Sequence, residues 1–540
     1  MQTKNNSSIP ADGWAGLKQN FTQDALSGFL VFLLALPLSL GIAKASDFPA
    51  IFGIVTAIIG GVVVSFFAGS RLTIKGPAAG LIVIASGCVG AYGGGETGWH
   101  LTLGAIVVAG LVQVLFGVFK LGRFADFFPG AAIHGMLAAI GIIIMSKQIH
   151  TLLGINPKEL SGKEPLELLA MIPSSIMHEN AHLAEIGIAC LLIMILFSFV
   201  RHRHLKKIPA PLVVLIIAIP LGLVLHVKTE NGIANFSLVK IGNLMDAFSN
   251  GVINADFSGI STNTGLFIQY VILFSLIGSI ESLLTAKAID GMDPYHRKSD
   301  FNKDLVAVGI GNTLSGLLGG LPMISEVARS SANVGNGAKT RWANFFHGLF
   351  LLIAVLFAVP FIEMIPNAAL AAMLIFVGFR LAHPKEFMHM WHLGKEQLFI
   401  FVVTIFMTLA TDLLIGVGSG ILLELLINAL NGAPIRSLFK SDYTLEAAEN
   451  GEHTLYIRNA LLFSNNIMVK KELARIPRTE NVCVDLSQAK LVDHSSLVLL
   501  SDLSLDFKNS GGLLISRGLD THCQLGHDAT STYKLKGNRA

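Results

Sequence analysis

The stretch GGLPMISEVARSSANVGNGAKTR (residues 319–341) interrupts a chain that is otherwise strongly apolar. The runs LVAVGIGNTLSGLL before it and WANFFHGLFLLIAVLFAVPF after it have the composition of membrane segments. The stretch itself carries a glutamate, arginine and several serines and asparagines. Ionised side chains at the centre of a membrane helix cost roughly 2.5–3.5 kcal/mol each, so an ordinary membrane helix is excluded here. The reason for this interruption decides the fold.

The composition predicts a polytopic α-helical membrane protein that lies in a lipid bilayer. The chain has 540 residues, of which 52% are hydrophobic and only 14% are charged, whereas soluble domains average about 25% charged residues. The net charge of +3 is too small to indicate nucleic-acid binding. The polar N-terminal segment, 1–24, has no basic region leading into an apolar core, so no cleaved signal peptide is expected.

About fourteen apolar segments are expected between residues 25 and 430, by the length needed to cross a bilayer. They are predicted near 25–45, 50–69, 77–90, 99–119, 124–146, 183–200, 208–227, 265–288, 304–320, 327–337, 343–364, 367–381, 397–411 and 412–430. Two of them, 77–90 and 327–337, are too short to span the hydrocarbon core as helices. They are predicted to be half-helices.

The basic residues of the loops predict the orientation of the chain in the membrane. With the N-terminus in the cytoplasm, the loops on the cytoplasmic side carry Arg71 and the runs KLGR, RHRHLKK, YHRKSDFNK, AKTR, RLAHPKE and RSLFK. Cytoplasmic loops of membrane proteins are enriched in Lys and Arg. The agreement requires that both half-helices connect opposite sides of the membrane.

The chain changes character after residue 431, where a linker is expected over 431–450. HTLYIRNALLF, NVCVDLSQAK and GGLLISRG are typical of strands, and NIMVKKELARI and SSLVLLSDLSLDFKNSG are typical of helices between them. This alternation predicts a small cytoplasmic α/β domain over 451–525, followed by a tail over 526–540.

The two short segments have the same local pattern. SRLTIKGPAAGLIVIASG (70–87) and GGLPMISEVARSSANVGNG each place an extended piece before a short helix. Irregular backbone at membrane depth is tolerated only where it is buried in protein or lines a cavity. Paired interrupted segments in two halves of a chain indicate a transporter binding site. Seven segments per half is an odd number, which predicts a seven-plus-seven inverted repeat.

The half-helix starts predict an anion site made largely of backbone. A helix N-terminus has free N–H groups and about half a positive charge. The residues expected there are Lys75, Gly76, Pro77, Ala78, Ser325, Glu326, Val327, Ala328 and Arg329. For Glu326 we expect the backbone N–H to contribute, because its carboxylate would repel an anion.

Three charged side chains at membrane depth require an explanation. Glu281 lies four residues before Thr285 on one helix face, so the two are candidates for binding Na⁺ or carrying a proton; the alternative for Glu281 is a structural salt bridge. Arg329 either attracts the anion or neutralises Glu281 or Glu326 when the site is empty. Lys75 either adds charge to the site or extends toward the inner membrane surface.

These stretches resemble the SulP family of inorganic anion transporters over nearly the whole chain. The resemblance is carried by ALPLSLGIAKAS, IKGPAAG, ESLLTAKAID, NKDLVAVGIGNTLSGLLGGLP and ARSSAN, in that order. It implies core and gate domains, with an anion between the third and tenth segments at the backbone of Ser325, Glu326 and Val327. In similar cyanobacterial bicarbonate transporters an acidic residue and a threonine bind Na⁺, and they match Glu281 and Thr285 here.

The C-terminal region resembles a STAS domain, a cytoplasmic regulatory module associated with dimers. VDLSQAKLVDHSSLVLL carries the resemblance, with His494 and Ser496 departing from the family pattern. Ser495 matches the serine that is phosphorylated in stand-alone STAS regulators. The resemblance therefore implies a homodimer in a bacterial inner membrane and a regulatory candidate at Ser495.

The function expected is symport of sulfate or bicarbonate with Na⁺ or H⁺, by an elevator-like cycle and without any other cofactor. An uncoupled anion channel or exchanger is an alternative, although a buried coupling carboxylate favours a transporter. A second alternative is an intramembrane metalloprotease, because HENAH (178–182) matches the HExxH zinc pattern. That pattern requires both histidines on one buried helix and a third ligand. The sequence favours a transporter, not an enzyme.

Overall fold

The structure, a computed structural model, describes residues 9–122, 129–155, 160, 163–199, 209–225, 227, 237–241, 254–295, 297–411, 413–447 and 452–536. The loop RHRHLKK and parts of the expected N-terminal segment, linker and tail lie outside the described residues. The chain divides into two compact units. One unit comprises 1–122 and 141–380, and the other comprises 123–140 and 381–540. The second unit thus combines the C-terminal region with helical segments that we had expected within a separate domain, 25–430.

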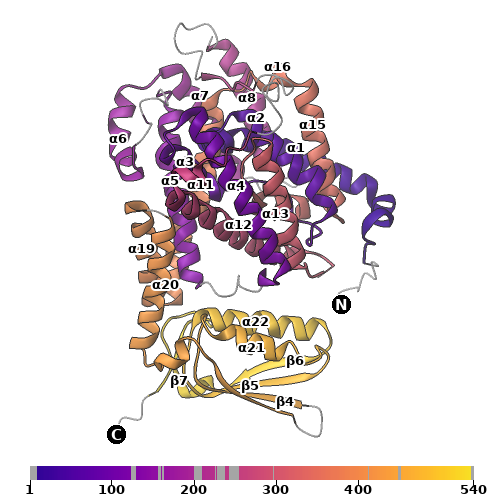
Figure 1. The fold of residues 1–540 in the computed structure, drawn as a ribbon, viewed down its shortest axis with the longest axis vertical. Coiled ribbons are helices and arrows are strands. Elements are labelled where there is room, and N and C mark those ends of the chain that lie inside the picture. Colours follow the sequence, from indigo (N-terminus) through magenta and orange to yellow (C-terminus); the bar gives the residue numbers. More distant parts are fainter. Residues whose placement is uncertain are drawn as a thin grey trace. The chain divides into compact units, whose positions relative to one another are not determined.

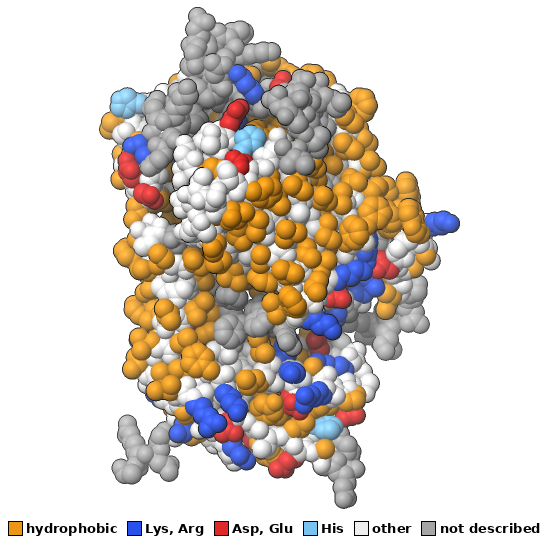
Figure 2. Space-filling view, viewed as in Figure 1, with side chains coloured by type: hydrophobic (Ala, Val, Ile, Leu, Met, Phe, Trp, Pro, Cys, Tyr) orange, Lys and Arg blue, Asp and Glu red, His pale blue; other side chains and the backbone are white. Residues whose placement is uncertain are grey.

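Most of the described chain is helical (Figure 1). Within the described residues, seven helical stretches are long and apolar enough to cross a membrane. They are α1 (Gly13–Ala45), α4 (Gly95–Val118), α5 (Gly130–Leu152), α7 (Ala181–Ser198), α12 (Thr264–Met292), α17 with α18 (Asn367–Leu393) and α20 (Leu413–Leu430). On the face seen in Figure 2, hydrophobic side chains cover wide areas with few charges among them.

Shorter helices account for the remaining expected segments. They are α2 (Ala50–Ile58), α8 (Ala210–Val224), α13 (Phe301–Leu317), α15 (Trp342–Phe357) and α19 (Lys395–Ala410), together with α6 (Pro165–Met177), which we did not expect as a helix. α2 continues through a π-helical turn, η1 (Ile59–Val63), and a 3₁₀ turn, η2 (Val64–Phe66). The glycines of η1 allow close packing, since a Cβ on Gly61 would lie 2.5 Å from Cα of Gly348 in α15.

The first unit contains both predicted interruptions. The first consists of strand β1 (Lys75–Pro77), a 3₁₀ turn η3 (Ala79–Leu81) and the short helix α3 (Ile82–Ala91). The second consists of strand β2 (Met323–Ser325) and the short helix α14 (Val327–Gly335). The structure therefore confirms an extended piece followed by a half-length helix in each half of the chain.

Helix packing in the first unit relates the two halves to one another. α4, which follows the first interruption, packs on α13, which precedes the second. α15, which follows the second interruption, packs on α2 and η1, which precede the first. This reciprocal packing accompanies the pairing of β1 with β2.

The C-terminal region of the second unit is built on one mixed sheet of six strands. Its central strand, β5 (Asn481–Val492), pairs in parallel with β4 (Glu452–Leu461) and β6 (Leu513–Arg517). α21 (Asn466–Leu473) and α22 (His494–Asn509) lie on one face of the sheet (Figure 1). Side chains from both helices and the strands form a single buried core that includes Leu455, Val484, Leu500 and Phe507.

The sheet extends beyond the range that the sequence indicated. β3 (Asp442–Ala447) begins inside the expected linker and pairs with β4. β7 (His522–Gln524) and β8 (Tyr533–Leu535) pair with each other, and β8 also pairs with the end of β5. The described α/β region thus runs from Asp442 to Leu535 and not only over 451–525.

Candidate functional site

The two interruptions meet as an antiparallel pair of three-residue strands. Lys75 lies opposite Ser325, Gly76 opposite Ile324 and Pro77 opposite Met323. All residues of both strands are buried. The pairing satisfies backbone groups that would otherwise be unpaired at membrane depth. It also fixes the starts of α3 and α14 relative to each other.

The first half-helix begins without a side-chain cap. Ala78 is in an extended conformation at the N-cap, and its side chain cannot accept a hydrogen bond. Among the described residues, no partner is found for the N–H groups of Ala79 and Gly80. Such free N–H groups at a helix start favour an anion. Gly76, Pro77 and Ala78 therefore shape this terminus by their small size and extended backbone.

The second half-helix begins at Glu326, and here the structure corrects two expectations. The N–H of Ser325 donates to Ser282 Oγ at 3.2 Å, and the N–H of Glu326 donates to the carbonyl of Ile74 at 2.9 Å. Of the three backbone N–H groups that we expected to bind an anion, those of Ser325 and Glu326 are therefore occupied, because β2 and the residue after it bond to neighbouring elements. The Glu326 carboxylate turns back and accepts the N–H of Arg329 at 2.8 Å. It caps its own helix.

Two N–H groups remain at the start of α14. In the described residues, the N–H groups of Val327 and Ala328 have no hydrogen-bond partner. Half of the Val327 side chain is exposed, so this turn is accessible. Of the residues expected at this helix start, Val327 and Ala328 are thus the two whose backbone N–H groups are free.

Arg329 is fully buried, and its Nε, Nη1 and Nη2 atoms have no hydrogen-bond partner among the described residues. Its guanidinium lies against β1, since a Cβ on Gly76 would be 2.5 Å from Nη1. An unpaired buried cation is costly unless an anion compensates it. Within the described residues no salt bridge joins Arg329 to Glu281 or Glu326, so its charge is not compensated by either carboxylate.

Glu281 projects from α12 toward the first half-helix. Its side chain is almost fully buried, and Oε1 has no hydrogen-bond partner among the described residues. Gly80 faces this carboxylate so closely that a Cβ there would overlap it. Thr285, one turn along α12, is also buried. No salt bridge to Glu281 is found in the described part of the chain, so the structural alternative has no support.

Lys75 was expected to add charge to the anion site or to extend toward the membrane surface, but its ammonium is paired inside the protein. Its ammonium donates to Asp304 Oδ1 at 2.9 Å and Oδ2 at 3.1 Å, and also to Thr73 Oγ1. Lys75 and Asp304 are both buried. The lysine side chain therefore forms an internal ion pair and does not extend to the membrane surface.

Three buried residues of the first unit were not predicted from the sequence as relevant to the site. Asp304 was expected only as the first residue of the segment 304–320, although one acidic residue directly before LVAVGIG was a signal. Ser282 is adjacent to Glu281 and was overlooked as a small polar residue. His347 of α15 is fully buried, and neither of its ring nitrogens has a hydrogen-bond partner among the described residues. Nothing in the run WANFFHGLF distinguishes this histidine from a packed core residue.

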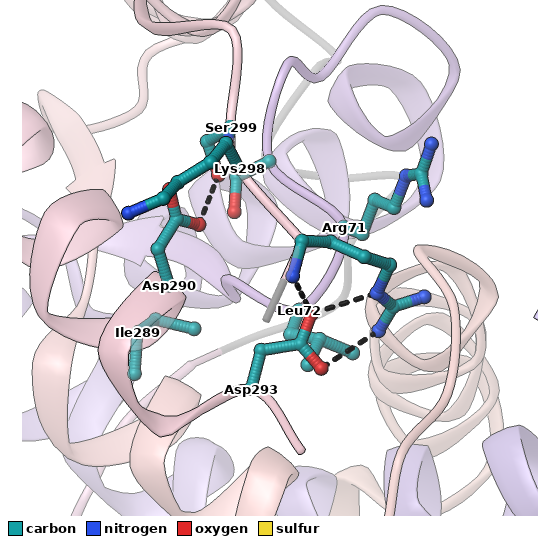
Figure 3. Close-up of a pocket in the computed structure, with 9 residues that line it drawn as sticks. Arg71, Leu72, Ile289, Asp290, Asp293, Lys298 and Ser299 are labelled. Atoms are coloured by element: carbon teal, nitrogen blue, oxygen red, sulfur yellow. Dashed lines mark hydrogen bonds and ion pairs between the residues drawn. The ribbon is translucent and has the colours of Figure 1, made fainter. Parts of the chain in front are cut away.

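A small pocket lies at the end of α12 and is shown in Figure 3. Asp290 accepts hydrogen bonds from Ser299, and Asp293 forms an ion pair with Arg297 at 2.7 Å. The charged groups of this pocket are thus largely paired with each other. One of its lining residues, Ser70, donates its N–H to Asp304 at 3.0 Å, so the pocket adjoins the Lys75–Asp304 pair.

Two further sequence hypotheses concern Ser495 as a regulatory residue and HENAH as a zinc site. Ser495 lies in the first turn of α22, and its Oγ accepts the N–H of Gly130 at 3.3 Å within the second unit; its regulatory role stays a prediction. His178 follows α6, whereas His182 lies in α7. The two histidines of HENAH therefore do not share one helix, and the described residues hold no cluster of three metal-binding side chains.

Paired half-helices inside a multi-span helical unit, with free N–H groups and a buried arginine at their starts, define a polytopic membrane transporter for anions. A sequence model of the sulfate permease family matches residues 21–404. The chain belongs to this family. It is an inorganic anion transporter and not an enzyme.

Three proteins are similar to this chain over most of its length. The Bacillus subtilis protein YvdB, whose name assigns it provisionally to sulfate transport, is 26% identical over 523 residues, covering 93% of this chain and 92% of YvdB. The bicarbonate transporter BicA of Picosynechococcus sp. is 24% identical over 407 residues, covering 75% of this chain and 69% of BicA. The structure of SLC26A9 matches with a TM-score of 0.67 at 15% identity, covering 93% of this chain and 85% of that one, so the fold is shared.

Proposed function

We propose that this protein is a secondary active transporter that moves sulfate or bicarbonate together with Na⁺ or H⁺. The observation that supports this most is the arrangement around Arg329. Its buried guanidinium has three unpartnered nitrogens beside β1, close to two half-helix starts with free N–H groups. An anion between these donors would compensate the buried charge and both helix dipoles. The names of YvdB and BicA support the two candidate anions.

The coupling ion binds at Glu281 in this proposal. A buried carboxylate oxygen without a partner is unfavourable unless a proton or a cation neutralises it. Glu281 contacts the first turn at Gly80, so its charge state acts directly on the helix start that would hold the anion. Thr285 supplies a further oxygen one turn away, as a Na⁺ site would require.

The cycle that we propose is elevator-like. The first unit's core carries anion and cation past a fixed part of the protein, with the N-terminus and the α/β region in the cytoplasm of a bacterial cell. A ligand shifts a conformational equilibrium only through its differential affinity for the two states. A core in which no cation or proton neutralises Glu281 should therefore move across the membrane poorly. A homodimer is part of the proposal, because the C-terminal region resembles a module associated with dimers.

Radiolabelled uptake into proteoliposomes tests this function. Sulfate and bicarbonate are offered separately, each with an inward Na⁺ gradient, an inward H⁺ gradient or no gradient. We expect accumulation of one anion under one of the cation gradients. Uptake that stays downhill under every gradient would indicate an uncoupled channel or exchanger and contradict the proposal.

A further inference from the structure

The carboxylate of Asp304 is the most heavily bonded side chain near the two interruptions. It lies in the first turns of α13, with 1% of its side chain exposed. Both of its oxygens accept from the Lys75 ammonium, at 2.9 and 3.1 Å. The third ammonium hydrogen is taken by Thr73 Oγ1. The lysine thus has no donor left for a transported anion.

Asp304 also contacts the two segments that lead into the half-helices. Oδ1 accepts the N–H groups of Gly69 and Ser70, at 3.1 and 3.0 Å, in the loop before β1. Oδ2 accepts the hydroxyl of Ser325, the last residue of β2, at 3.2 Å. One buried carboxylate therefore bonds to the loop before β1, to β1 through Lys75, and to β2.

We propose that Asp304 is a positioning residue for anion binding, which holds the starts of both half-helices in one arrangement, and that Lys75 is its counter-ion and not an anion ligand. This inference rests on the proposed anion site between α3 and α14. Asp304 does not touch the anion itself. It acts through β1 and β2, on which the free N–H groups and Arg329 depend.

Geometry gives the reason that affinity, and not only stability, should respond. β2 is followed directly by α14, so a shift of Ser325 moves the N–H groups of Val327 and Ala328. β1 is followed by η3, and its Gly76 lies against the Arg329 guanidinium. Displacing donors by about 1 Å from their acceptor weakens a polar site severely. Loss of Asp304 should therefore misalign both termini at once.

Both charges of the Lys75–Asp304 ion pair can be removed together. Lys75→Met and Asp304→Asn each leave one buried charge without its partner, which is strongly unfavourable. The double variant leaves no charge. Its Asn amide can still accept from Gly69 and Ser70 and donate to Ser325, so the two segments stay connected.

The test measures the dissociation constants of sulfate and bicarbonate by the anion-dependent rise in melting temperature of the purified full chain. We expect each single variant to bind the anion at least about tenfold more weakly, and the double variant to return to within about threefold of wild type. Asp293→Asn is the matched control. It breaks the buried Arg297–Asp293 pair at the end of α12 and should lower the melting temperature without changing the dissociation constant.

Four outcomes would overturn the inference: wild-type affinity in both single variants, a double variant no better than the singles, an equal loss of affinity in Asp293→Asn, or no anion-dependent shift in the wild type. If the single variants do not fold, Thr73→Val replaces them. It removes one acceptor of Lys75 and should weaken binding about threefold, whereas wild-type affinity would count against the inference. Failure of cation-driven uptake alone contradicts the proposed function and leaves this binding result intact.

Discussion

The carboxylate of Glu281, on α12, lies directly against Gly80 and occupies the space that a side chain at Gly80 would need. The contact joins the residue proposed to bind the coupling ion to the first turn of the helix proposed to bind the anion. A negative charge on Glu281 would therefore repel an anion at that turn, and neutralisation of Glu281 by a proton or a cation would remove the repulsion. This relationship gives a physical basis for the coupled transport that we propose.

Gly80→Ala tests this contact. The added methyl group must displace the Glu281 carboxylate, so we expect cation-driven uptake to fall at least about tenfold, because a displaced catalytic or binding group typically loses that much. Gly90→Ala is the control on the same half-helix, since no atom lies within 4 Å of a Cβ there. Equal uptake by both variants would show that the close contact has no functional weight.

Arg329 should determine anion affinity. Arg329→Gln removes the positive charge of the guanidinium group. We expect the KM for the anion to rise about tenfold or more, because a charge-assisted hydrogen bond in a buried site is worth a few kcal/mol. Arg329→Lys should recover part of the loss, because it restores the charge without the fork geometry. Initial uptake rates across anion concentrations measure this. An unchanged KM in Arg329→Gln would exclude the arginine from the site.

Glu326 has two separable effects, because it caps α14 and also carries a negative charge. Glu326→Asn keeps a capping side chain and removes the charge, so we expect the KM for the anion to fall by about fivefold, the equivalent of roughly 1 kcal/mol of repulsion. Glu326→Ala removes the cap as well and should cost about 1 kcal/mol of stability. Uptake and thermal unfolding of the two variants are compared. A higher KM in Glu326→Asn would mean that the carboxylate assists binding.

The α/β region should lose stability in mild acid because of His494. This imidazole is 9% exposed, and its Nδ1 lies 2.8 Å from the carbonyl oxygen of Thr530. Burial lowers the pKa of His494 below its usual value of about 6.5, and the Thr530 contact offsets this only in part. The unfolded state therefore takes up the proton more readily, so stability is full above about pH 6.5 and falls as the pH drops through the folded-state pKa.

Hydrogen exchange in α22 between about pH 8 and pH 5 measures this effect, in wild type and in His494→Gln. We expect protection in α22 to decline toward acid pH in the wild type and to decline less in the variant. His178→Gln, at an exposed histidine of the first unit, serves as the control and should follow the wild type. An identical pH profile in wild type and His494→Gln would contradict the assignment.

The helices and half-helices could be predicted because hydrophobicity and length constrain membrane segments strongly. The polar run around Arg329 and the Gly76–Pro77 step marked both interruptions. The strands β3, β7 and β8 could not be predicted, because short strands at a sheet edge have no strong periodic pattern and depend on partners far away in sequence. β8, for example, is held by its pairing with the end of β5.

The candidate site was predicted in composition and only partly in detail. Sequence shows which charges lie at membrane depth, and so it indicated Glu281 and Arg329. It does not show how charges pair in space. Lys75 was therefore assigned to the anion, although Asp304, 229 positions away, binds it. The occupied N–H groups of Ser325 and Glu326 were missed for the same reason, since their partners come from other elements.

The most direct test of the account is transport by Glu281→Gln in proteoliposomes, compared with wild type in two assays. We predict that the variant loses cation-driven accumulation of the anion but retains anion exchange across the membrane, because glutamine keeps the site neutral and cannot bind or release the coupling ion. Glu281→Gln with wild-type accumulation and unchanged cation dependence would contradict the claim that Glu281 couples anion to cation.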